Sequence, residues 1–399
     1  MKKKILMIIP KLVDGGAERV VSNLTLELYK DYDIDILLDY NCTGYEYKGN
    51  IISLVDQQVE PKGIEQCKLY IRKLLWLKKS KRETRYSAYI SHSRWSNILN
   101  VLSGAKKQNV IVAMHCSITK PSTKCIQERL IKIVEKYTLR RAPKVIAVSQ
   151  GVAKELVELI GVKREKIYSI WNGSDIEQIQ KNAKQELDEI QKAWYLDSEF
   201  IVSAMGRYTI EKGHWHLIRA FSVIVRKYPK AKLLLIGDGK LKEYYERLIQ
   251  GLSLQNNVVL TGFQKNPFSL IAHSDLFVFP SISEGFPCSL VEAICSSVPC
   301  VSADFRNGAR EILGYDMKLE KLEHRYETMD YGVMVPVCSE ILYQAFDELE
   351  EQEKILADSI IYMIEHKEEA EKFVKNNQKR LYEFSIEEMA DKWKRAIEE

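Results

Sequence analysis

The sequence has 399 residues, a length that suggests two or about three domains, and its 46% apolar and 29% charged residues are typical of a water-soluble globular protein. No run approaches the roughly 18 to 20 consecutive apolar residues of a membrane-spanning helix, so that class of protein is excluded. Eight cysteines show neither a CxxC pair nor metal-ligand spacing, which indicates small buried residues in a reducing, cytoplasmic compartment.

The charge is distributed unevenly along the chain, although the net charge is only +4. Residues 1–176 carry 31 basic and 18 acidic groups, whereas residues 177–399 carry 28 basic and 37 acidic groups. A single hydrophobic core does not require such a division. The first half is therefore predicted to face something anionic.

Short apolar runs alternate with amphipathic stretches in the first half, which is the pattern of βαβ units and a mostly parallel sheet. The first apolar run has a basic start like a signal peptide, but Pro10 and Lys11 end it early, so we interpret it as a buried strand. Helical patterns cover residues 17–29 and 126–141. The predicted strands are residues 5–9, 34–38, 88–91, 110–114 and 144–148.

A polar stretch at residues 176–192 is interpreted as a linker helix, after which the alternation begins again. Helical patterns there cover residues 214–227 and 290–295. The predicted strands are residues 200–205, 232–236, 258–261, 276–280 and 299–302.

These elements predict an α/β fold with two Rossmann-like, doubly wound parallel-sheet domains that face a cleft. The first domain is expected over residues 1–175 and the second over residues 193–378. The remaining residues, 379–399, are expected to form a helix that returns to the first domain. Ligands are expected at the carboxyl ends of the strands.

One candidate binding motif, SISEGFPCSLVEA, follows the predicted strand that ends at residue 280. A helix is expected to begin near Pro287, and the free amides of such a helix start bind phosphate. Glu284 precedes the turn and Glu292 lies in the helix, so two carboxylates can bind different hydroxyl groups of one ligand. The alternative is one charge at the helix start and one solvated helix charge.

A second motif, GRYTIEKGH, also follows a predicted strand and precedes a helix. Arg207 and Lys212 place two cations in one loop, where they can neutralise a diphosphate leaving group as a metal ion would. The alternative is a solvated basic loop. A third, weaker nucleotide signal is the pair Gly15 and Gly16, which opens the first helix without a complete GxGxxG pattern.

Taken together, several stretches resemble glycosyltransferase family 4, a large retaining family with the GT-B fold. They occur in the family's order over roughly residues 4–313. The stretches are GGAERV, AVSQGVAKEL, IWNGSD, GRYTIEKG, LLLIGDG, TGF and PSISEGFPCSLVEA.

The resemblance assigns roles to individual residues of the donor site. Arg207 and Lys212 match the pair that binds the donor diphosphate, and Glu292 matches the glutamate that binds the ribose hydroxyls. Glu284 matches the glutamate against the donor sugar and is expected to be catalytic. His115 matches a histidine that contacts the donor sugar near the reacting carbon, and it is the second expected catalytic residue.

The other expected donor contacts come from turns and adjoining apolar positions. Gly285 and Phe286 match the turn whose amides hold sugar and phosphate. Gly15 and Gly16 match the glycine loop that closes over the donor. Phe263 of TGF and Leu290 of SLVEA complete the expected donor-binding set.

The resemblance implies a metal-independent hexosyl- or N-acetylhexosaminyltransferase without a cofactor, which retains the anomeric configuration by front-face attack. Trp171 stands where the family usually has proline, so no contact is assigned to Asn172. The stretch SADFRNGAREIL resembles a subset that uses UDP-sugars to build lipid-linked glycans, although Ala309 replaces its proline. A UDP-sugar donor and a lipid-linked glycan acceptor are therefore expected.

Residues 68–85 contain eight basic groups, one glutamate and several leucines. Such a helix fits the surface of an anionic membrane, where each cation contributes about 1 kcal/mol. We therefore expect a peripheral protein on the cytoplasmic face of the membrane. The alternative is a core helix with a basic exterior. The expected membrane contacts are Arg72, Lys73, Trp76, Lys78 and Lys79.

Two other functional classes remain as alternatives: a catalytically silent partner or glycan-binding subunit, and an epimerase or phosphorylase of the same fold. The DxD-like run at Asp33 and Asp35 is interpreted as part of a strand, and the HWH run at residue 214 as a helix start. Nucleic-acid binding is not expected, because the basic residues form no recognisable module.

Overall fold

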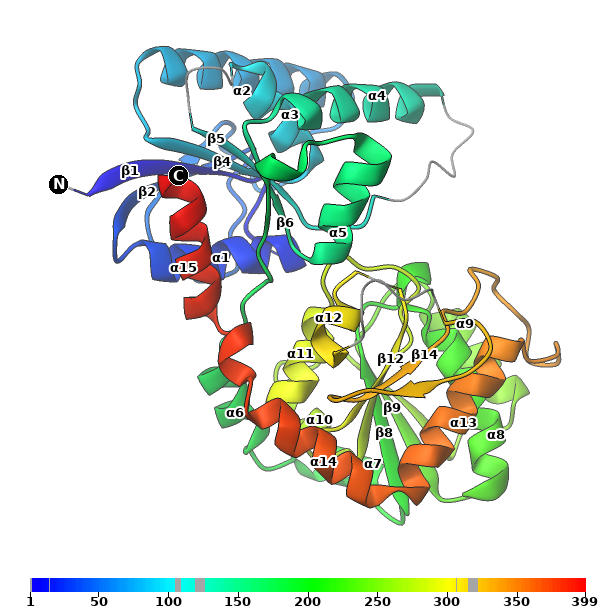
Figure 1. Cartoon of the computed structure of the whole chain (residues 1–399). Coiled ribbons are helices and arrows are strands. Elements are labelled where there is room, and N and C mark those ends of the chain that lie inside the picture. Colours follow the sequence, from blue (N-terminus) through cyan, green and yellow to red (C-terminus); the bar gives the residue numbers. More distant parts are fainter. Residues whose placement is uncertain (1, 14, 105–108, 119–125, 306, 315–321) are drawn as a thin grey trace. The chain divides into compact units, whose positions relative to one another are not determined.

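The computed structural model describes the chain except for residues 1, 14, 105–108, 119–125, 306 and 315–321 (Figure 1). The chain forms two compact units. Unit 1 comprises Met1–Ser174 and Phe384–Glu399, and unit 2 comprises Asp175–Glu383. None of the helices in the described ranges has the length and apolar character needed to cross a membrane.

Unit 1 is built on a parallel seven-stranded sheet of order β3-β2-β1-β4-β5-β6-β7. Its central strands are almost entirely apolar because both faces of the sheet are covered by helices. The strands are β1 (Lys3–Ile8), β2 (Tyr32–Leu38), β3 (Asn50–Ser53), β4 (Ala88–His92), β5 (Val110–Met114), β6 (Lys144–Ala147) and β7 (Ile167–Ser169).

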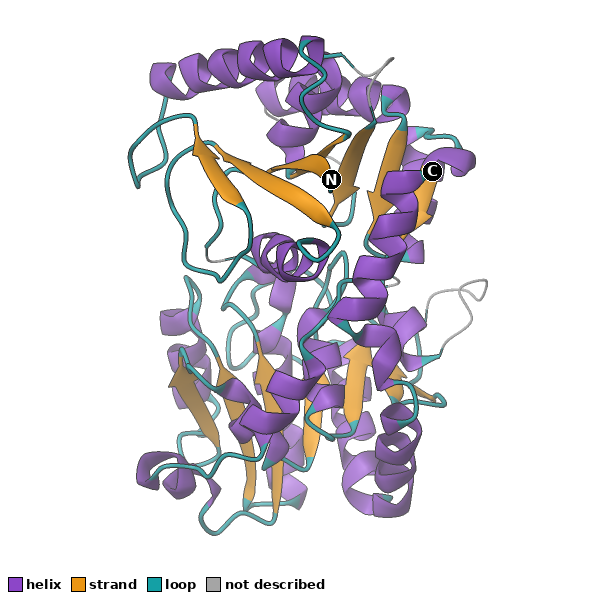
Figure 2. Ribbon diagram, turned by 90° about the vertical axis from the view of Figure 1, so that its left-hand side faces the viewer, coloured by secondary structure: helices purple, strands orange, loops and turns teal. Residues whose placement is uncertain are grey.

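Figures 1 and 2 show how the helices of unit 1 are divided between the two faces of its sheet. Helices α2 (Ile64–Arg82), α3 (Arg94–Leu102) and α4 (Ile126–Arg141) cover one face. The other face packs on α1 (Gly16–Leu28) and on α15 (Ile386–Glu398), whose apolar residues share one core with β1 and β2.

The C-terminal helix α15 is held in unit 1 by polar contacts as well as by its core residues. Asn109 donates to the carbonyl of Ile397 at 2.7 Å, and Lys144 donates to that of Ala396 at 2.8 Å. Unit 1 therefore contains both ends of the described chain.

A short helix, α5 (Gln150–Glu155), continues into a π-helical turn at Leu156–Ile160.

Unit 2 has a second seven-stranded sheet, of order β10-β9-β8-β11-β12-β14-β13, in which only the β13–β14 pair is antiparallel. The two sheets confirm the predicted doubly wound α/β fold. The strands are β8 (Phe200–Met205), β9 (Ala231–Ile236), β10 (Val258–Gly262), β11 (Leu276–Phe279), β12 (Cys300–Ala303), β13 (Glu327–Thr328) and β14 (Val333–Val335).

The helices of unit 2 begin with a break that the sequence interpretation missed. Residues 176–192 form parts of two helices, because Asp188 caps the second with a reciprocal Gln191 capping box. The helices are α6 (Ile176–Ala183), α7 (Glu189–Tyr195), α8 (His214–Lys227), α9 (Lys242–Gly251), α10 (Pro267–Ala272), α11 (Cys288–Cys295), α12 (Ala309–Leu313), α13 (Glu351–Glu365) and α14 (Lys367–Gln378).

The DxD-like run lies in strand β2, as predicted. Asp35 is buried and accepts hydrogen bonds from Tyr86 at 2.6 Å and Asn50 at 3.2 Å, and it pairs with Lys4 at 2.9 Å. Burial alone raises the pKa of Asp35, but these donors outweigh it and lower the pKa. Asp35 therefore joins β2 to Lys4 of β1 and Asn50 of β3.

Candidate active site

Two of the predicted motifs meet at the carboxyl end of the unit 2 sheet, because β8 and β11 are neighbouring parallel strands. Lys212 follows β8 in a 3-10 turn at Ile210–Lys212, and Glu284 follows β11. Their side chains form an ion pair, with Lys212 Nζ donating to Glu284 Oε1 at 2.5 Å. The Ser281 hydroxyl donates to the same oxygen at 3.1 Å.

The position of Lys212 depends on a close approach of the two backbone loops. Gly213 has a φ of +63°, and a Cβ atom there would lie 2.4 Å from the carbonyl oxygen of Pro280. A hydrogen bond of 2.8 Å from the Ile282 amide to the Glu211 carbonyl joins the same loops. Only glycine fits at residue 213, so this residue brings the lysine to the glutamate.

The ion pair leaves Lys212 with further hydrogen-bonding capacity. An ammonium group has three donors, and its Nζ also lies 5.3 Å from the centre of the Phe279 ring. Lys212 and Glu284 are both half-buried, so their charges act in a partly desolvated environment. This arrangement can bind a ligand that is anionic in one part and hydroxylated in another.

The other donor-site residues of unit 2 lie close to this pair in the sequence. Arg207 is exposed two residues beyond β8, and its carbonyl accepts a hydrogen bond from the Thr209 amide at 2.9 Å. Glu292 is half-buried in α11, which begins directly after Pro287 as predicted. Phe263 follows β10 with 83% of its surface exposed. Gly285, Phe286 and Leu290 are buried.

Unit 1 has a pair of histidines at the carboxyl ends of β4 and β5, of which His92 is buried and His115 is half-buried. His92 Nδ1 and His115 Nε2 are 2.9 Å apart, and the His92 ring lies 5.7 Å from that of Trp393 in α15. Of the described side chains, none is a partner for His92 Nε2 or His115 Nδ1. Because one ring must donate to the other, the tautomers of the two histidines are coupled.

The glycine pair lies at the start of the first helix of unit 1. Gly16 is the first residue of α1, and Gly15 is the N-cap residue, with an extended backbone. A Cβ atom at Gly15 would lie 1.9 Å from a carboxylate oxygen of Glu18, whereas one at Gly16 would meet nothing within 4 Å. The backbone at Gly16 is therefore open to a ligand.

Comparison with known proteins identifies the family. Residues 14–178 match the family described as Glycosyltransferase Family 4, and residues 185–316 match Glycosyl transferases group 1. A glycosyltransferase of Methanocaldococcus jannaschii is 36% identical over 277 residues, which are 68% of each chain. The chain belongs to glycosyltransferase family 4.

Other family-4 relatives and solved structures agree with this assignment. An N-acetylgalactosaminyltransferase of Campylobacter jejuni, named for a diphospho-undecaprenol-linked acceptor, is 27% identical over 363 residues, 88% of this chain and 92% of the relative. The crystal structure of Anabaena HepE with UDP has a TM-score of 0.74 at 18% identity, covering 99% of each chain. The GT-B fold is thereby confirmed, and the protein is a glycosyltransferase.

Of the site residues that the family-4 resemblance assigns, the structure brings Lys212 and Glu284 into contact. It does not join Arg207 to them, and Gly15, Gly16 and His115 belong to unit 1. Sequence reasoning missed His92, although the signal was present, since the predicted strand at residues 88–91 ends directly before it. The carboxyl ends of neighbouring parallel strands lie side by side, so a histidine that ends β4 and one that follows β5 can be expected to lie close together.

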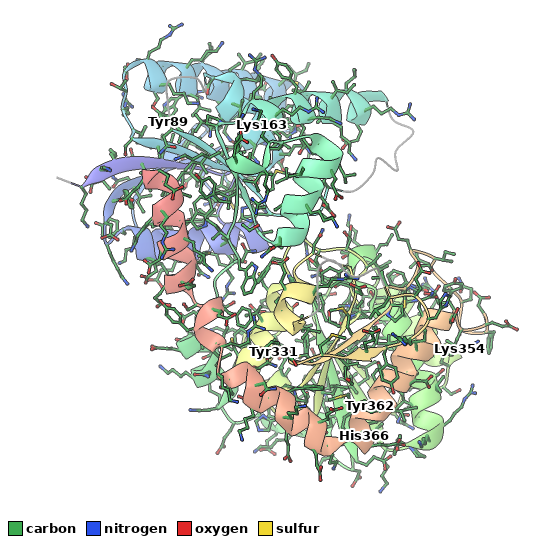
Figure 3. All side chains as sticks on the ribbon, in the orientation of Figure 1. Tyr89, Lys163, Tyr331, Lys354, Tyr362 and His366 are labelled. Carbon is green, nitrogen blue, oxygen red and sulfur yellow. The ribbon has the colours of Figure 1, made fainter. Side chains whose placement is uncertain are left out.

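The membrane contact predicted at Lys73 is wrong, because this side chain is completely buried. Lys73 Nζ donates to Asp39 at 2.6 Å and to Ser96 at 2.9 Å, and burial lowers its pKa despite Asp39. Lys81 on the same helix is also buried, 5.0 Å from the ring of Tyr89, which Figure 3 labels. The core-helix alternative therefore holds for this face of α2.

The other predicted contacts on α2 lie on the surface of unit 1. Arg72, Lys78 and Lys79 are exposed, and Trp76 is half-buried. Helix α2 thus has a buried face with two lysines, and its exposed cations number five with Lys68 and Arg82.

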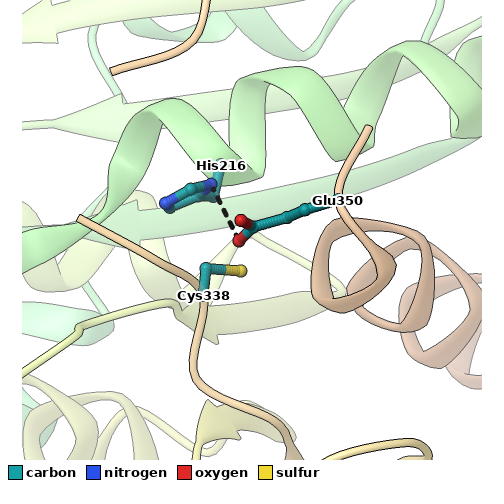
Figure 4. Close-up of side chains that lie close together, drawn as sticks. All are labelled: His216, Cys338 and Glu350. Carbon is teal, nitrogen blue, oxygen red and sulfur yellow. Dashed lines mark ion pairs between the residues drawn. The ribbon is translucent and has the colours of Figure 1, made fainter. Parts of the chain in front are cut away.

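A group with metal-ligand chemistry, His216, Cys338 and Glu350, lies beside α8 (Figure 4). Both ring nitrogens of His216 are engaged: Nδ1 lies 2.8 Å from Glu353 Oε1, and Nε2 lies 2.7 Å from the carbonyl oxygen of Ser339. His216 therefore has no lone pair directed at a metal ion. The HWH run begins α8, as predicted, and its second histidine joins α8 to α13.

The buried histidines predict that stability rises with pH. Burial lowers the pKa of His115 to about 4 and that of His214 to about 3, from an ordinary 6.5, and the pKa of His92 is well below 6.5. At pH values between 6.5 and these lowered pKa values, the unfolded chain binds more protons than the folded chain. As the pH drops below 6.5, the free energy of unfolding should therefore decrease by up to about 1.4 kcal/mol per pH unit for each histidine.

Urea unfolding at pH 7 and pH 5 measures this effect. His214→Phe should give a shallower pH dependence than the parent protein, because one of the neutral histidines is then absent. An unchanged slope would show that His214 is already protonated in the folded protein at pH 5.

Proposed function

We propose that this glycosyltransferase moves a sugar from a UDP-sugar to a lipid-linked glycan acceptor, with retention of the anomeric configuration and without a metal ion. The observation that carries the proposal is the Lys212–Glu284 pair at the carboxyl end of the unit 2 sheet. Lys212 supplies positive charge where a diphosphate would leave, and Glu284 supplies a carboxylate for sugar hydroxyls.

In the proposed reaction, an acceptor hydroxyl attacks the anomeric carbon on the face that the diphosphate leaves. The bond from the anomeric carbon to the diphosphate oxygen breaks, and a bond to the acceptor oxygen forms. The acceptor proton passes to the departing diphosphate. Lys212 and Arg207 stabilise the charge that develops on that group, which is the largest electrostatic demand of the step.

Several features support the choice of donor. Phe263 presents an aromatic ring beyond the end of β10, which suits stacking on a nucleobase. Glu292 lies in the helix that follows Glu284, where it can accept hydrogen bonds from ribose hydroxyls. Structures of HepE contain UDP or UDP-glucose, and we extend the uridine preference to this chain.

The lipid-linked acceptor is supported by the C. jejuni relative, whose name specifies a diphospho-undecaprenol acceptor. Arg72, Lys78 and Lys79 on α2 provide exposed cations for an anionic surface or a lipid diphosphate. We therefore place the enzyme on the cytoplasmic face of the membrane.

Thermal shift with UDP, GDP and ADP tests the proposal for the nucleotide. UDP is expected to raise the melting temperature, and Glu292→Ala should remove most of this shift because the ribose contact is lost. Lys354→Ala, an exposed substitution on α13, is the matched control and should keep the full shift. A larger shift with GDP or ADP would reject the uridine assignment.

The nucleotide that binds then selects labelled nucleotide-sugars for incubation with solvent-extracted membrane lipid. Label is expected in the lipid phase. Label that enters only water-soluble glycan would reject the lipid-linked acceptor and leave the donor assignment intact.

A further inference from the structure

Helix α4 exposes a continuous apolar stripe on the surface of unit 1. Leu130, Ile133, Val134 and Tyr137 are 58%, 64%, 40% and 50% exposed. Their spacing places all four on one face of the helix, which a globular protein normally turns toward its core. Leu139, on the opposite side of α4, is buried.

The charges of α4 are sorted around this stripe, which we call the α4 patch. The helix has five basic residues and only two acidic ones, Glu128 and Glu135. Both glutamates are held by Arg94 of α3, with Nη1 at 2.8 Å from Glu128 and Nε at 3.1 Å from Glu135. Both acidic groups of the helix therefore share one cationic partner, and the basic residues of α4 still outnumber them.

Basic groups lie beside the α4 patch. Arg141 donates to the Tyr137 hydroxyl, and its guanidinium carbon lies 4.9 Å from the centre of that ring. Lys136 donates to the carbonyl of Leu159 at 3.0 Å, and the Leu159 side chain is itself exposed next to the helix. Arg140 donates to the carbonyl of Ile160 at 2.6 Å. The patch thus combines apolar side chains, a tyrosine and several cations.

We propose that the α4 patch inserts into the interface of an anionic lipid bilayer. Helices that lie in the plane of a membrane combine an apolar stripe with Lys and Arg, and tyrosine is enriched at the depth of the headgroups. The excess of basic over acidic residues on α4 complements an anionic surface, which favours a lipid bilayer as the occupant.

The position of α4 agrees with the membrane-bound action proposed above, on which this inference rests. Helices α2, α3 and α4 cover the same face of the unit 1 sheet (Figures 1 and 2). The exposed cations of α2 and the α4 patch therefore lie on the same side of unit 1. In this arrangement α2 supplies charge attraction, and α4 supplies the apolar groups that enter the bilayer.

Co-flotation of the full chain with lipid vesicles tests the inference. The parent protein should bind vesicles of phosphatidylcholine mixed with phosphatidylglycerol better than vesicles of phosphatidylcholine alone. Leu130→Ser with Ile133→Ser should lower the partition coefficient at least about 10-fold, because two side chains that enter the apolar region are lost. Raised salt should weaken but not abolish binding of the parent protein.

The matched control is Ile190→Ser with Leu196→Ser, which removes two exposed apolar side chains from unit 2. It should bind vesicles like the parent, and unchanged melting temperatures exclude unfolding as the cause. Equal vesicle binding by both double variants, or none by the parent protein, would overturn the inference. So would a dimer of the parent protein that the α4 variant loses, because a second copy would then cover the patch.

The thermal shift with UDP separates this result from the proposed function. A parent protein that is stabilised by UDP but does not bind vesicles refutes the role of the α4 patch alone. A protein that binds vesicles through α4 without responding to any nucleotide refutes the donor proposal alone.

Discussion

Replacing Lys212 with alanine is expected to lower kcat by about 10²–10³-fold, which is the usual effect of removing one preorganised group that stabilises charge in the transition state. The reason lies in its position. Lys212 is fixed at the end of the unit 2 sheet by Gly213 and by its ion pair with Glu284. Steady-state transfer from the nucleotide-sugar that the thermal shift selects measures the change.

Lys212→Arg and Lys354→Ala are the controls for this prediction. Lys212→Arg keeps the charge but replaces a compact ammonium with a planar guanidinium, so it should recover only part of the rate. Lys354→Ala removes an exposed lysine of α13 and should leave kcat unchanged. If Lys212→Ala turned over at the parent rate, the catalytic role of the pair would be refuted, and a silent binding subunit would become the better interpretation.

The fold was largely predictable because buried parallel strands are continuous apolar runs. The run at residues 5–9 predicts β1, and the run at residues 276–280 predicts β11. Strands β3, β7, β13 and β14 were not predicted, because each is only two to four residues long. The break between α6 and α7 was readable from Asp188 and Gln191, whose spacing is that of a capping box.

The unit 2 part of the site was also predictable, since functional side chains that follow two neighbouring parallel strands lie together at the carboxyl end of the sheet. Lys212 and Glu284 satisfy that rule. The burial of Lys73 was not predictable, because its partner Asp39 lies 34 residues away and nothing in the pattern of α2 distinguishes an inward lysine from an outward one. Local sequence reveals the charge of a helix more readily than its orientation.

The exposed apolar residues of α4 likewise show that the sequence pattern of a helix does not determine which of its faces is buried. A stripe at Leu130, Ile133, Val134 and Tyr137 predicts a core face by periodicity alone. The structure turns this stripe outward and uses Arg94 to bind the acidic side of the helix. Which side of an amphipathic helix faces the core is thus decided by partners that are distant in sequence.

Glu353→Ala is expected to lower the free energy of unfolding of unit 2 by about 3–5 kcal/mol, the range for breaking a buried ion pair by removing one partner. Glu353 and Arg219 are completely buried, and Arg219 Nε donates to Glu353 Oε1 at 2.8 Å. His216 contacts the same oxygen at 2.8 Å. Without the carboxylate, the guanidinium charge keeps uncharged partners, which include the Glu348 carbonyl at 2.8 Å and the Tyr343 ring at 4.8 Å.

Glu365→Ala provides a matched control, because Lys227 and Glu365 also join α8 to α13 but lie at the surface. Water replaces a lost surface partner at little cost, so this variant should unfold close to the parent. Urea unfolding of both variants distinguishes burial from charge pairing as the source of stability. Equal destabilisation by the two substitutions would mean that attraction between the helices, rather than an uncompensated buried charge, determines the loss.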